Sequence, residues 1–204
     1  MTPLLAGRGL SLLRGDRCLF ADLDFVLDAG ELLLVEGPNG SGKTSLLRAI
    51  AGLLPPDDGE VLWRGRNARR FRQPFHAELV WMGHFPGFKG DLTLLENLRF
   101  ESGLRCPGGA AADPVFERLG LCTLGRIPFR LLSAGQQRRV ALARLALSGA
   151  MLWLMDEPFT NLDAGGRGLV RDLLSEHLGV GGVAVMASHQ DPAIDAGVRR
   201  IALQ

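Results

Sequence analysis

The residues at 37–44 have the composition of a loop that binds phosphate groups. They are Gly37, Pro38, Asn39, Gly40, Ser41, Gly42, Lys43 and Thr44. Their order is the G-x-x-x-x-G-K-[ST] pattern of a phosphate loop. Gly40 and Gly42 can adopt a positive φ without a Cβ clash, so successive backbone N–H groups can turn towards one anion. Lys43 then supplies a charge for the β- and γ-phosphates of a nucleoside triphosphate, and the Thr44 hydroxyl supplies a ligand for Mg²⁺.

The segments on either side of this loop favour the same ligand. An apolar run at 31–35 predicts a strand before the loop, and residues 43–51 predict a helix after it that ends at Gly52. The positive end of that helix dipole would point at the bound anion. Ser45, which follows the motif directly, is therefore included in the predicted nucleotide site.

A pair of acidic residues, Asp156 and Glu157, follows another apolar run at 151–155. A continuous apolar run predicts a buried parallel strand, and ligands bind beyond the carboxyl ends of such strands. Asp156 can hold Mg²⁺ there, directly or through water, and Glu157 can polarise a water for attack on the γ-phosphate. Two acids at a strand end are otherwise simply solvated, and the phosphate loop upstream favours the catalytic interpretation.

A second anion site is predicted where a later helix begins. Ser133 can cap a helix that runs to about Leu147. The backbone N–H groups that would face an anion belong to Ala134, Gly135 and Gln136. The chain thus has two helix N-termini suited to phosphate, although a single nucleotide needs only one.

The run at 132–144 resembles the LSGGQ signature of the ATP-binding cassette (ABC) ATPases, with Ala134 where glycine is commoner. The resemblance implies that two cassettes pair head to tail, and that each signature closes on the ATP held by the other copy. The signature residues expected to act in trans are Ser133, Ala134, Gly135 and Gln136. Residues 158–163 resemble the D-loop that crosses such a dimer, so Asp163 is expected in the same shared site.

The run at 187–190 follows an apolar strand and resembles the switch segment of the same family, whose histidine senses the γ-phosphate. His189 is the residue at that position. The resemblance therefore implies a catalytic set of Lys43, Glu157 and His189. His76 and His177 have no motif context and are predicted to lie on the surface.

Two positions depart from the pattern of the family. Arg14 stands where an aromatic residue usually stacks on adenine; an arginine plane can also stack on a base. Phe20 is the nearest aromatic substitute, although a core position suits it better. His84 stands where a glutamine usually follows a strand, here at 79–82. His84 is expected either to contact Mg²⁺-bound water or to couple to a partner.

The segments at 83–93, 96–98 and 127–139 resemble the haem-exporter ATP-binding subunits of bacterial cytochrome c maturation. That family implies an ATPase bound peripherally at the cytoplasmic face of the inner membrane, paired with integral membrane subunits and with a second copy of itself. Hydrolysis of ATP to ADP and phosphate would serve haem delivery or release of a haem-loaded chaperone. No residue of this chain forms a readable haem pocket, so no direct haem site is predicted.

Two other functions stay open from the residues. One is an ABC ATPase for another exported substrate. The other is a soluble ABC protein that acts on DNA or ribosomes, although such proteins usually carry two cassettes or a long coiled-coil insertion. A cassette that cannot hydrolyse ATP is disfavoured, because Lys43, Asp156, Glu157 and His189 are all present.

The elements that must position these residues alternate between strands and helices. Predicted strands lie at 4–13, 18–27, 31–35, 60–64, 79–82, 151–155, 182–187 and 198–203. Predicted helices lie at 43–51, 93–101, 114–119, 133–147 and 165–178, and residues 107–113 are predicted to form a loop. This alternation predicts an α/β fold. With the resemblance, it implies a P-loop NTPase cassette with a parallel core sheet, N-terminal antiparallel strands and an inserted helical subdomain at about 85–135.

Composition bounds these expectations. The chain has 204 residues and is 47% hydrophobic, which fits a single domain spanning 1–204. The net charge of +1 gives no support for general nucleic-acid binding. Cys18, Cys106 and Cys122 form no close pair or metal spacing, as expected in a reducing cytosol. We also expect no signal peptide and no membrane span. Four apolar residues of the helical block have two equally favoured roles, a groove for a partner helix or a packed subdomain core: Phe85, Phe88, Leu92 and Leu95.

Overall fold

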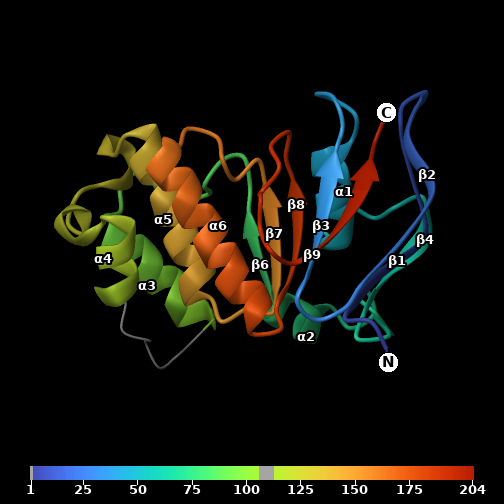
Figure 1. The fold of residues 1–204 in the computed structure, drawn as a ribbon, viewed down its shortest axis with the longest axis horizontal. Helices are drawn as coiled ribbons and strands as arrows, with labels where there is room; N and C mark the ends of the chain where they lie inside the picture. Colours follow the sequence, from blue (N-terminus) through green and yellow to red (C-terminus); the bar gives the residue numbers. More distant parts are fainter. Residues whose placement is uncertain (1, 106–112) are drawn as a thin grey trace.

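The computed structural model describes residues 2–105 and 113–204, which form two β-sheets flanked by helices (Figure 1). The first sheet is antiparallel, with the strand order β2-β1-β4-β5. Its strands are β1 (Leu5–Arg14), β2 (Arg17–Leu27), β4 (Asp58–Trp63) and β5 (Arg66–Asn67). The predicted N-terminal antiparallel strands are thus confirmed.

The second sheet is parallel, with the order β6-β7-β8-β3-β9. Its strands are β3 (Glu31–Glu36), β6 (Leu79–Met82), β7 (Leu152–Asp156), β8 (Val183–Ala187) and β9 (Gly197–Ala202). Alternate residues serve opposite faces, as the pleat requires: Leu152 and Leu154 join one core cluster, whereas Trp153 and Met155 join the other. Burial on both faces explains the continuous apolar runs of the sequence.

Helices cover both faces of the parallel sheet (Figure 1). They are α1 (Lys43–Ile50), α2 (Arg72–Ala77), α3 (Leu94–Arg105), α4 (Asp113–Leu119), α5 (Ala134–Leu147) and α6 (Ala164–Gly179), with 3₁₀ turns η1 (Cys122–Leu124) and η2 (Phe129–Leu131). Helix α1 and the antiparallel sheet share one core cluster with the parallel sheet, and α5 and α6 share the other. The carboxyl ends of the parallel strands point the same way, towards the top of Figure 1.

The sequence predicted most of these elements. Ser133 caps α5 as expected, through a full capping box with Gln136, and a similar capping box at Thr93 opens α3. Between β6 and β7 the described residues form helices and turns but no strand, which agrees with an inserted helical block. Helix α2 and strand β5 were not predicted. The expected loop at 107–113 lies outside the described residues except at Asp113, and so does Cys106.

The prediction that His177 lies on the surface is wrong. Its side chain is 8% exposed and stacks on Trp153 with ring centroids 4.0 Å apart. The nearby Gly182 makes room for this stack, since a Cβ there would lie 2.3 Å from the His177 ring. The imidazole Nε2 lies 3.1 Å from the carbonyl oxygen of Val183.

The four apolar residues proposed for a partner groove divide between core and surface. Phe88 packs on Phe129, with ring centroids 4.9 Å apart, and Leu95 packs against the buried core. Phe85 is 83% exposed, whereas Leu92 is half-buried. The packed-core alternative therefore holds for Phe88 and Leu95. Across the described residues, no helix is long and apolar enough to cross a membrane.

Candidate functional site

The loop at 37–44 connects β3 to α1 in the predicted conformation. Gly40 and Gly42 have φ values of 81° and 104°, which confirms their predicted positive φ. Gly42 is also the N-cap of α1 and provides no side-chain hydrogen bond to it. The first N–H groups of α1 therefore have no capping side chain, which is the arrangement that binds an anion.

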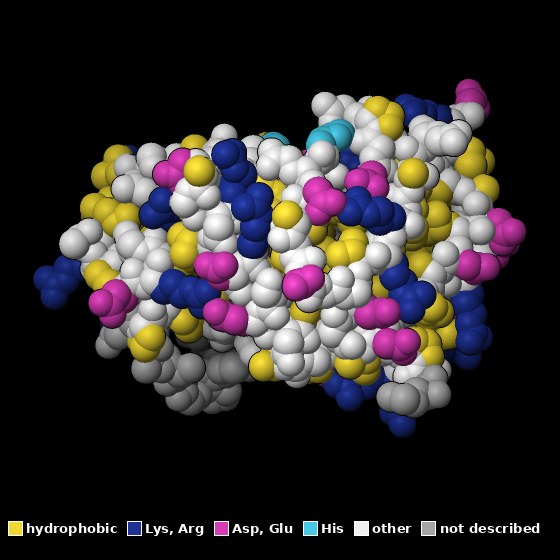
Figure 2. Space-filling view, in the orientation of Figure 1, with side chains coloured by type: hydrophobic (Ala, Val, Ile, Leu, Met, Phe, Trp, Pro, Cys, Tyr) yellow, Lys and Arg dark blue, Asp and Glu magenta, His cyan; other side chains and the backbone are white. Residues whose placement is uncertain are grey.

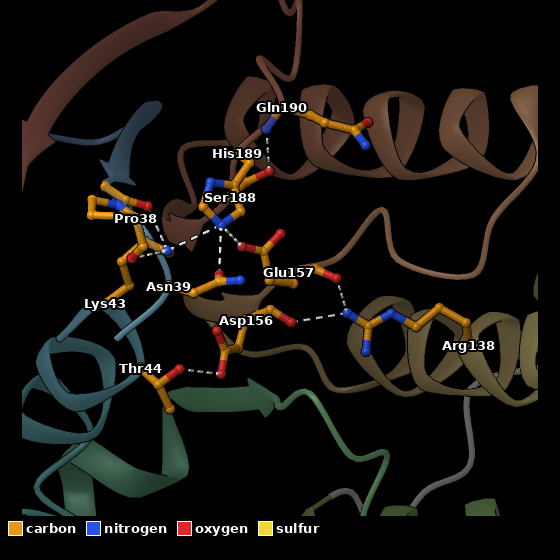
Figure 3. A network of polar contacts seen from close by, with 11 residues as sticks. Pro38, Asn39, Lys43, Thr44, Arg138, Asp156, Glu157, Ser188, His189 and Gln190 are labelled. Atoms are coloured by element: carbon orange, nitrogen blue, oxygen red, sulfur yellow. Dashed lines mark hydrogen bonds and ion pairs between the residues drawn. The ribbon is translucent and has the colours of Figure 1, made fainter. Parts of the chain in front are cut away.

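Lys43 lies beneath this loop with its side chain directed along it (Figure 3). The residue is only 7% exposed. Its Nζ donates hydrogen bonds to the carbonyl oxygens of Gly37 at 2.7 Å and Pro38 at 3.0 Å. The ammonium group is thus held at the mouth of the loop, where a phosphate would need it.

The side chain of Thr44, on α1, contacts the side chain of Asp156, at the end of β7. The Thr44 hydroxyl donates to Asp156 Oδ2 at 2.9 Å, and Asp156 is buried at the end of β7. A hydroxyl and one carboxylate are hard oxygen donors, which suits Mg²⁺, since this ion usually takes its other ligands from water and substrate phosphates. In keeping with so small a protein donor set, the described residues contain no group of three or more His, Cys, Asp or Glu arranged to hold a metal.

His189 joins the loop to the acidic pair (Figure 3). Its Nε2 lies 3.1 Å from Asn39 Oδ1, 3.2 Å from Lys43 Nζ and 3.5 Å from Glu157 Oε1. The segment is anchored by Ser188, which is fully buried, and whose hydroxyl accepts from Gln190 N–H at 2.9 Å. The other two residues of the predicted catalytic set, Lys43 and Glu157, therefore lie within hydrogen-bonding or ion-pairing distance of one ring nitrogen of His189.

Glu157 has an unusual backbone that turns its carboxylate towards His189. Its φ is +49°, in the left-handed region that a residue with a side chain rarely adopts. The Glu157 N–H donates to the carbonyl oxygen of Ala187 at 2.9 Å. Its own carbonyl accepts from Arg138, which is 3% exposed. Loss of hydration lowers the pKa of Arg138 to about 10, so the guanidinium stays charged at neutral pH.

Arg138 was not predicted as a functional residue, although its place in an apolar stripe of the helix could have indicated it. Arg138 falls on the same helical face as Ala141, Leu142 and Leu145, at the spacing of an apolar stripe. All four residues are buried. A charged residue inside such a stripe must have hydrogen-bonding partners in the interior.

The side chains of the phosphate loop, the acidic pair and His189 line a cavity of about 570 Å³ at the carboxyl end of the parallel sheet. Its lining residues are Leu19, Asn39, Gly40, Gly42, Lys43, Thr44, Ser45, His84, Asp156, Glu157, Thr160 and His189. His84 thus lines the same cavity as the predicted metal ligands, and both of its expected roles stay predictions. Larger hollows of about 810 and 780 Å³ lie elsewhere and contain none of the phosphate-loop residues.

Arg14 does not line this cavity. It lies at the end of β1, and its guanidinium donates to the carbonyl oxygen of Leu13 at 3.3 Å. Leu19 of β2 lies against the loop instead, since a Cβ on Gly42 would be 3.1 Å from Leu19 Cβ. Phe20 is buried in the core, as its alternative assignment expected.

The residues expected to act in trans lie outside the cavity. Ser133 forms a full capping box with Gln136, and Ala134 beside it is exposed. Asp163 caps α6 by accepting from Gly166 N–H at 2.7 Å, while its side chain stays 72% exposed. The N-termini of α5 and α6 are therefore exposed to solvent, and their contact with a second copy of the chain stays a prediction.

The fold and this site define an α/β protein of the P-loop ATPase class. The family model for the ABC transporter matches residues 20–160. The chain belongs to the ABC transporter family as an ATP-binding domain, and an ABC cassette is an ATPase. Similar solved structures include an ATP-binding subunit of an ABC transporter, with a TM-score of 0.87, 23% identity and coverage of 98% of this chain and 86% of that one. A putative ABC transporter ATP-binding protein from Pyrococcus furiosus gives a TM-score of 0.83 at 22% identity, covering 98% and 96% of the two chains.

Curated relatives are more similar in sequence. The chain is 50% identical to the cytochrome c biogenesis ATP-binding export protein CcmA of Methylococcus capsulatus, over 91% of this chain and 90% of that protein. It is 46% identical to the protein of the same name from Yersinia pestis, over 98% of this chain and 93% of that protein. These relatives are matched along nearly their whole length.

Proposed function

We propose that this chain is the ATP-hydrolysing subunit of a membrane ABC complex that exports or delivers haem for cytochrome c biogenesis. The observation that carries the proposal is the identity of 46% to 50% with cytochrome c biogenesis export proteins over more than nine-tenths of the chain. Turnover would drive haem delivery or release of a haem-loaded chaperone. The chain would act as one domain over 1–204, with a helical subdomain at about 85–135.

The phosphate loop would hold the triphosphate. Backbone N–H groups of residues 39–45 would face the phosphates, and Lys43 would exchange its bonds to backbone carbonyls for bonds to phosphate oxygens. Thr44 and Asp156 would hold Mg²⁺, which when bound neutralises charge on the β- and γ-phosphates. His84 would contact water in the shell of that ion.

Hydrolysis would use the acidic turn and the switch histidine. Glu157 accepts a proton from water as the water oxygen attacks the γ-phosphorus, and the bond from that phosphorus to the leaving ADP oxygen breaks. His189 bridges Glu157 and Lys43, and so it can report the presence of the γ-phosphate to both. Asn39 fixes the ring of His189 from the loop side.

A second copy of the chain would complete each site. Ser133, Ala134, Gly135 and Gln136 present the free end of α5 and would face the ATP bound by the partner copy, and Asp163 would cross the same interface. Arg14 lies outside the cavity that would hold the phosphates, so stacking on the base would take place beyond that cavity.

The chain would bind peripherally at the cytoplasmic face of the bacterial inner membrane, through an integral membrane subunit. Phe85, exposed beside the cavity residue His84, is a candidate contact for that subunit. We propose no direct haem site and no nucleic-acid partner. On the face in Figure 2 acidic and basic side chains are interspersed, without one large field of basic residues.

Complementation tests the proposal. Lys43→Ala in the source cell should abolish covalent haem attachment to c-type cytochromes, since the phosphates lose their main cation. Arg69→Ala, at an exposed turn residue that does not line the cavity, serves as the control and should leave attachment normal. Normal maturation with Lys43→Ala would overturn the haem assignment. Co-purification with a different membrane subunit would then identify an exporter for another substrate.

A further inference from the structure

Arg138 connects α5 to the ends of two strands of the parallel sheet (Figure 3). Its Nη1 donates to the carbonyl oxygen of Gly83 at 2.9 Å, and its Nε donates to that of Pro158 at 3.2 Å. Its Nη2 donates to the carbonyl oxygens of Asp156, at 2.9 Å, and Glu157. One buried guanidinium thus serves four backbone acceptors.

These acceptors lie around the reacting groups. Asp156 is the predicted metal ligand and Glu157 the predicted general base. Gly83 is the residue directly before His84, which also lines the cavity. The left-handed backbone of Glu157 needs support from its surroundings, because such a conformation is unfavourable for a residue with a side chain. The planar fork of arginine can hold several carbonyls at fixed relative positions, which a lysine cannot.

The other end of this connection is the signature. Arg138 lies five residues after the N-cap Ser133, on the first turns of the same helix. A helix of this length is rigid, so the free N-terminus of α5 and the guanidinium move together. Any displacement of α5 would be transmitted directly to the turn that carries Glu157.

We propose that Arg138 is a positioning residue for hydrolysis, which fixes the Glu157 turn to α5 and so makes turnover depend on the position of the signature helix. This inference rests on the proposed ATPase mechanism. Arg138 itself touches neither substrate nor metal. It acts through the orientation of Glu157 and, by way of Gly83, of His84.

Steady-state ATPase measurements on the full chain test this role. Arg138→Gln should lower kcat about 10²-fold, the cost of a displacement of about 1 Å in a reacting group. The KM for ATP should stay within about threefold, because the phosphate loop is untouched. Arg138→Lys, which keeps the charge but not the fork, should recover part of kcat. If Arg138→Gln does not fold, Arg138→Lys carries the same test with a smaller expected loss.

Arg144→Gln is the matched control. Arg144 is on the same helix and also donates to a backbone carbonyl, that of Trp81 in β6 at 2.8 Å, and its guanidinium lies over the Phe88 ring. It should lower thermal stability while leaving kcat within about threefold. An equal loss of kcat in Arg144→Gln would mean that helix packing alone is responsible, and would overturn the inference.

A double-variant cycle separates this inference from the function on which it rests. If Arg138 acts through Glu157, adding Arg138→Gln to Glu157→Gln should lower kcat less than about twofold further. A further loss of about 10²-fold, or an unchanged kcat in folded Arg138→Gln alone, would overturn the positioning role. Failure of the proposed mechanism would look different, since Glu157→Gln alone would then keep wild-type turnover.

Discussion

At the scale of single residues, the site is organised around one nitrogen, Nε2 of His189. A neutral imidazole nitrogen either accepts a hydrogen bond or donates one. Nε2 can therefore accept from Lys43 or donate to Asn39 and Glu157, and its tautomer decides which bond forms. In the proposed mechanism, phosphate oxygens would replace His189 as a partner of Lys43, and His189 would then be free to bond to Glu157. This exchange would link substrate binding to the general base.

Glu157→Gln tests the base directly. The amide keeps the shape of the side chain but cannot accept the proton from water, so kcat should fall about 10²- to 10⁴-fold. ATP binding, measured by equilibrium titration with Mg²⁺ present, should change less than about threefold. Asp195→Asn, an exposed acid outside the cavity, should match the wild type in both measurements.

Asp156→Asn tests the proposed metal ligand. Loss of the negative charge should raise the Mg²⁺ concentration for half-maximal ATPase at least about tenfold. Removal of Mg²⁺ with a chelator should stop turnover in the wild type. An Asp156→Asn protein with an unchanged Mg²⁺ dependence would show that Asp156 only accepts the hydrogen bond from Thr44.

At the scale of elements, two capping boxes allow structural and functional roles to be separated. Thr93 opens α3 and Ser133 opens α5, each with reciprocal bonds to the residue three positions later. Replacing either residue with Ala should cost about 1 kcal/mol of stability in chemical denaturation. Only Ser133→Ala should also lower ATPase activity, because only α5 is proposed to face a nucleotide. Equal activity losses in both variants would contradict the role of the signature.

His177 gives α6 a pH-dependent contribution to stability. Burial lowers the pKa of His177 below its usual value of 6.5, since the imidazolium loses hydration. Below that pH the unfolded chain binds a proton that the folded chain still excludes. Stability is therefore fully present above about pH 6.5 and falls as the pH drops, by at most about 1.4 kcal/mol per pH unit.

His177→Gln should remove this slope. Denaturation at pH 7 and pH 5.5 should show a smaller loss of stability on acidification for the variant than for the wild type. The Trp153 stack is lost at both pH values, so the variant should be less stable at pH 7. An identical acid sensitivity in the two proteins would show that the imidazole is not the group responsible.

The elements predicted from the sequence were those with a strong local pattern. Strands β3, β7 and β8 are continuous apolar runs, and α5 has a capping box, so their positions followed from residue types alone. Helix α2 has only six residues, with Pro74 among them, and depends on burial of Phe75 against the core rather than on local propensity. His177 was misplaced because its burial depends on Gly182, in the connection between α6 and β8, and on the stack with Trp153 of β7.

The site was predictable where the chemistry requires a fixed spacing. The phosphate loop, Asp156, Glu157 and His189 meet as expected because strands β3, β7 and β8 are neighbours that end at one edge. Arg14 was assigned by resemblance; it lies outside the cavity, and its stacking on the base stays a prediction. The contacts of Arg138 join residues 18 to 55 positions away in sequence, which no local pattern specifies.

At the scale of the whole molecule, the proposed nucleotide site and the start of the signature helix are separate. The parallel sheet brings the loop, the acidic turn and the switch segment to one cavity, while the start of α5 stays free outside it. This separation is what a head-to-tail pair of identical chains would use, since each copy supplies one half of each of two sites. Arg138 would connect the two halves within a copy.

The central claim is that hydrolysis at this cavity drives cytochrome c biogenesis. The most direct test measures covalent haem on c-type cytochromes in cells whose only copy of the chain carries Glu157→Gln, with Asp195→Asn as the control. We predict that haem attachment falls to the level of a deletion strain, although the variant accumulates normally and stays bound to its membrane partner. Normal haem attachment, with a variant protein that hydrolyses no ATP when purified, would contradict it.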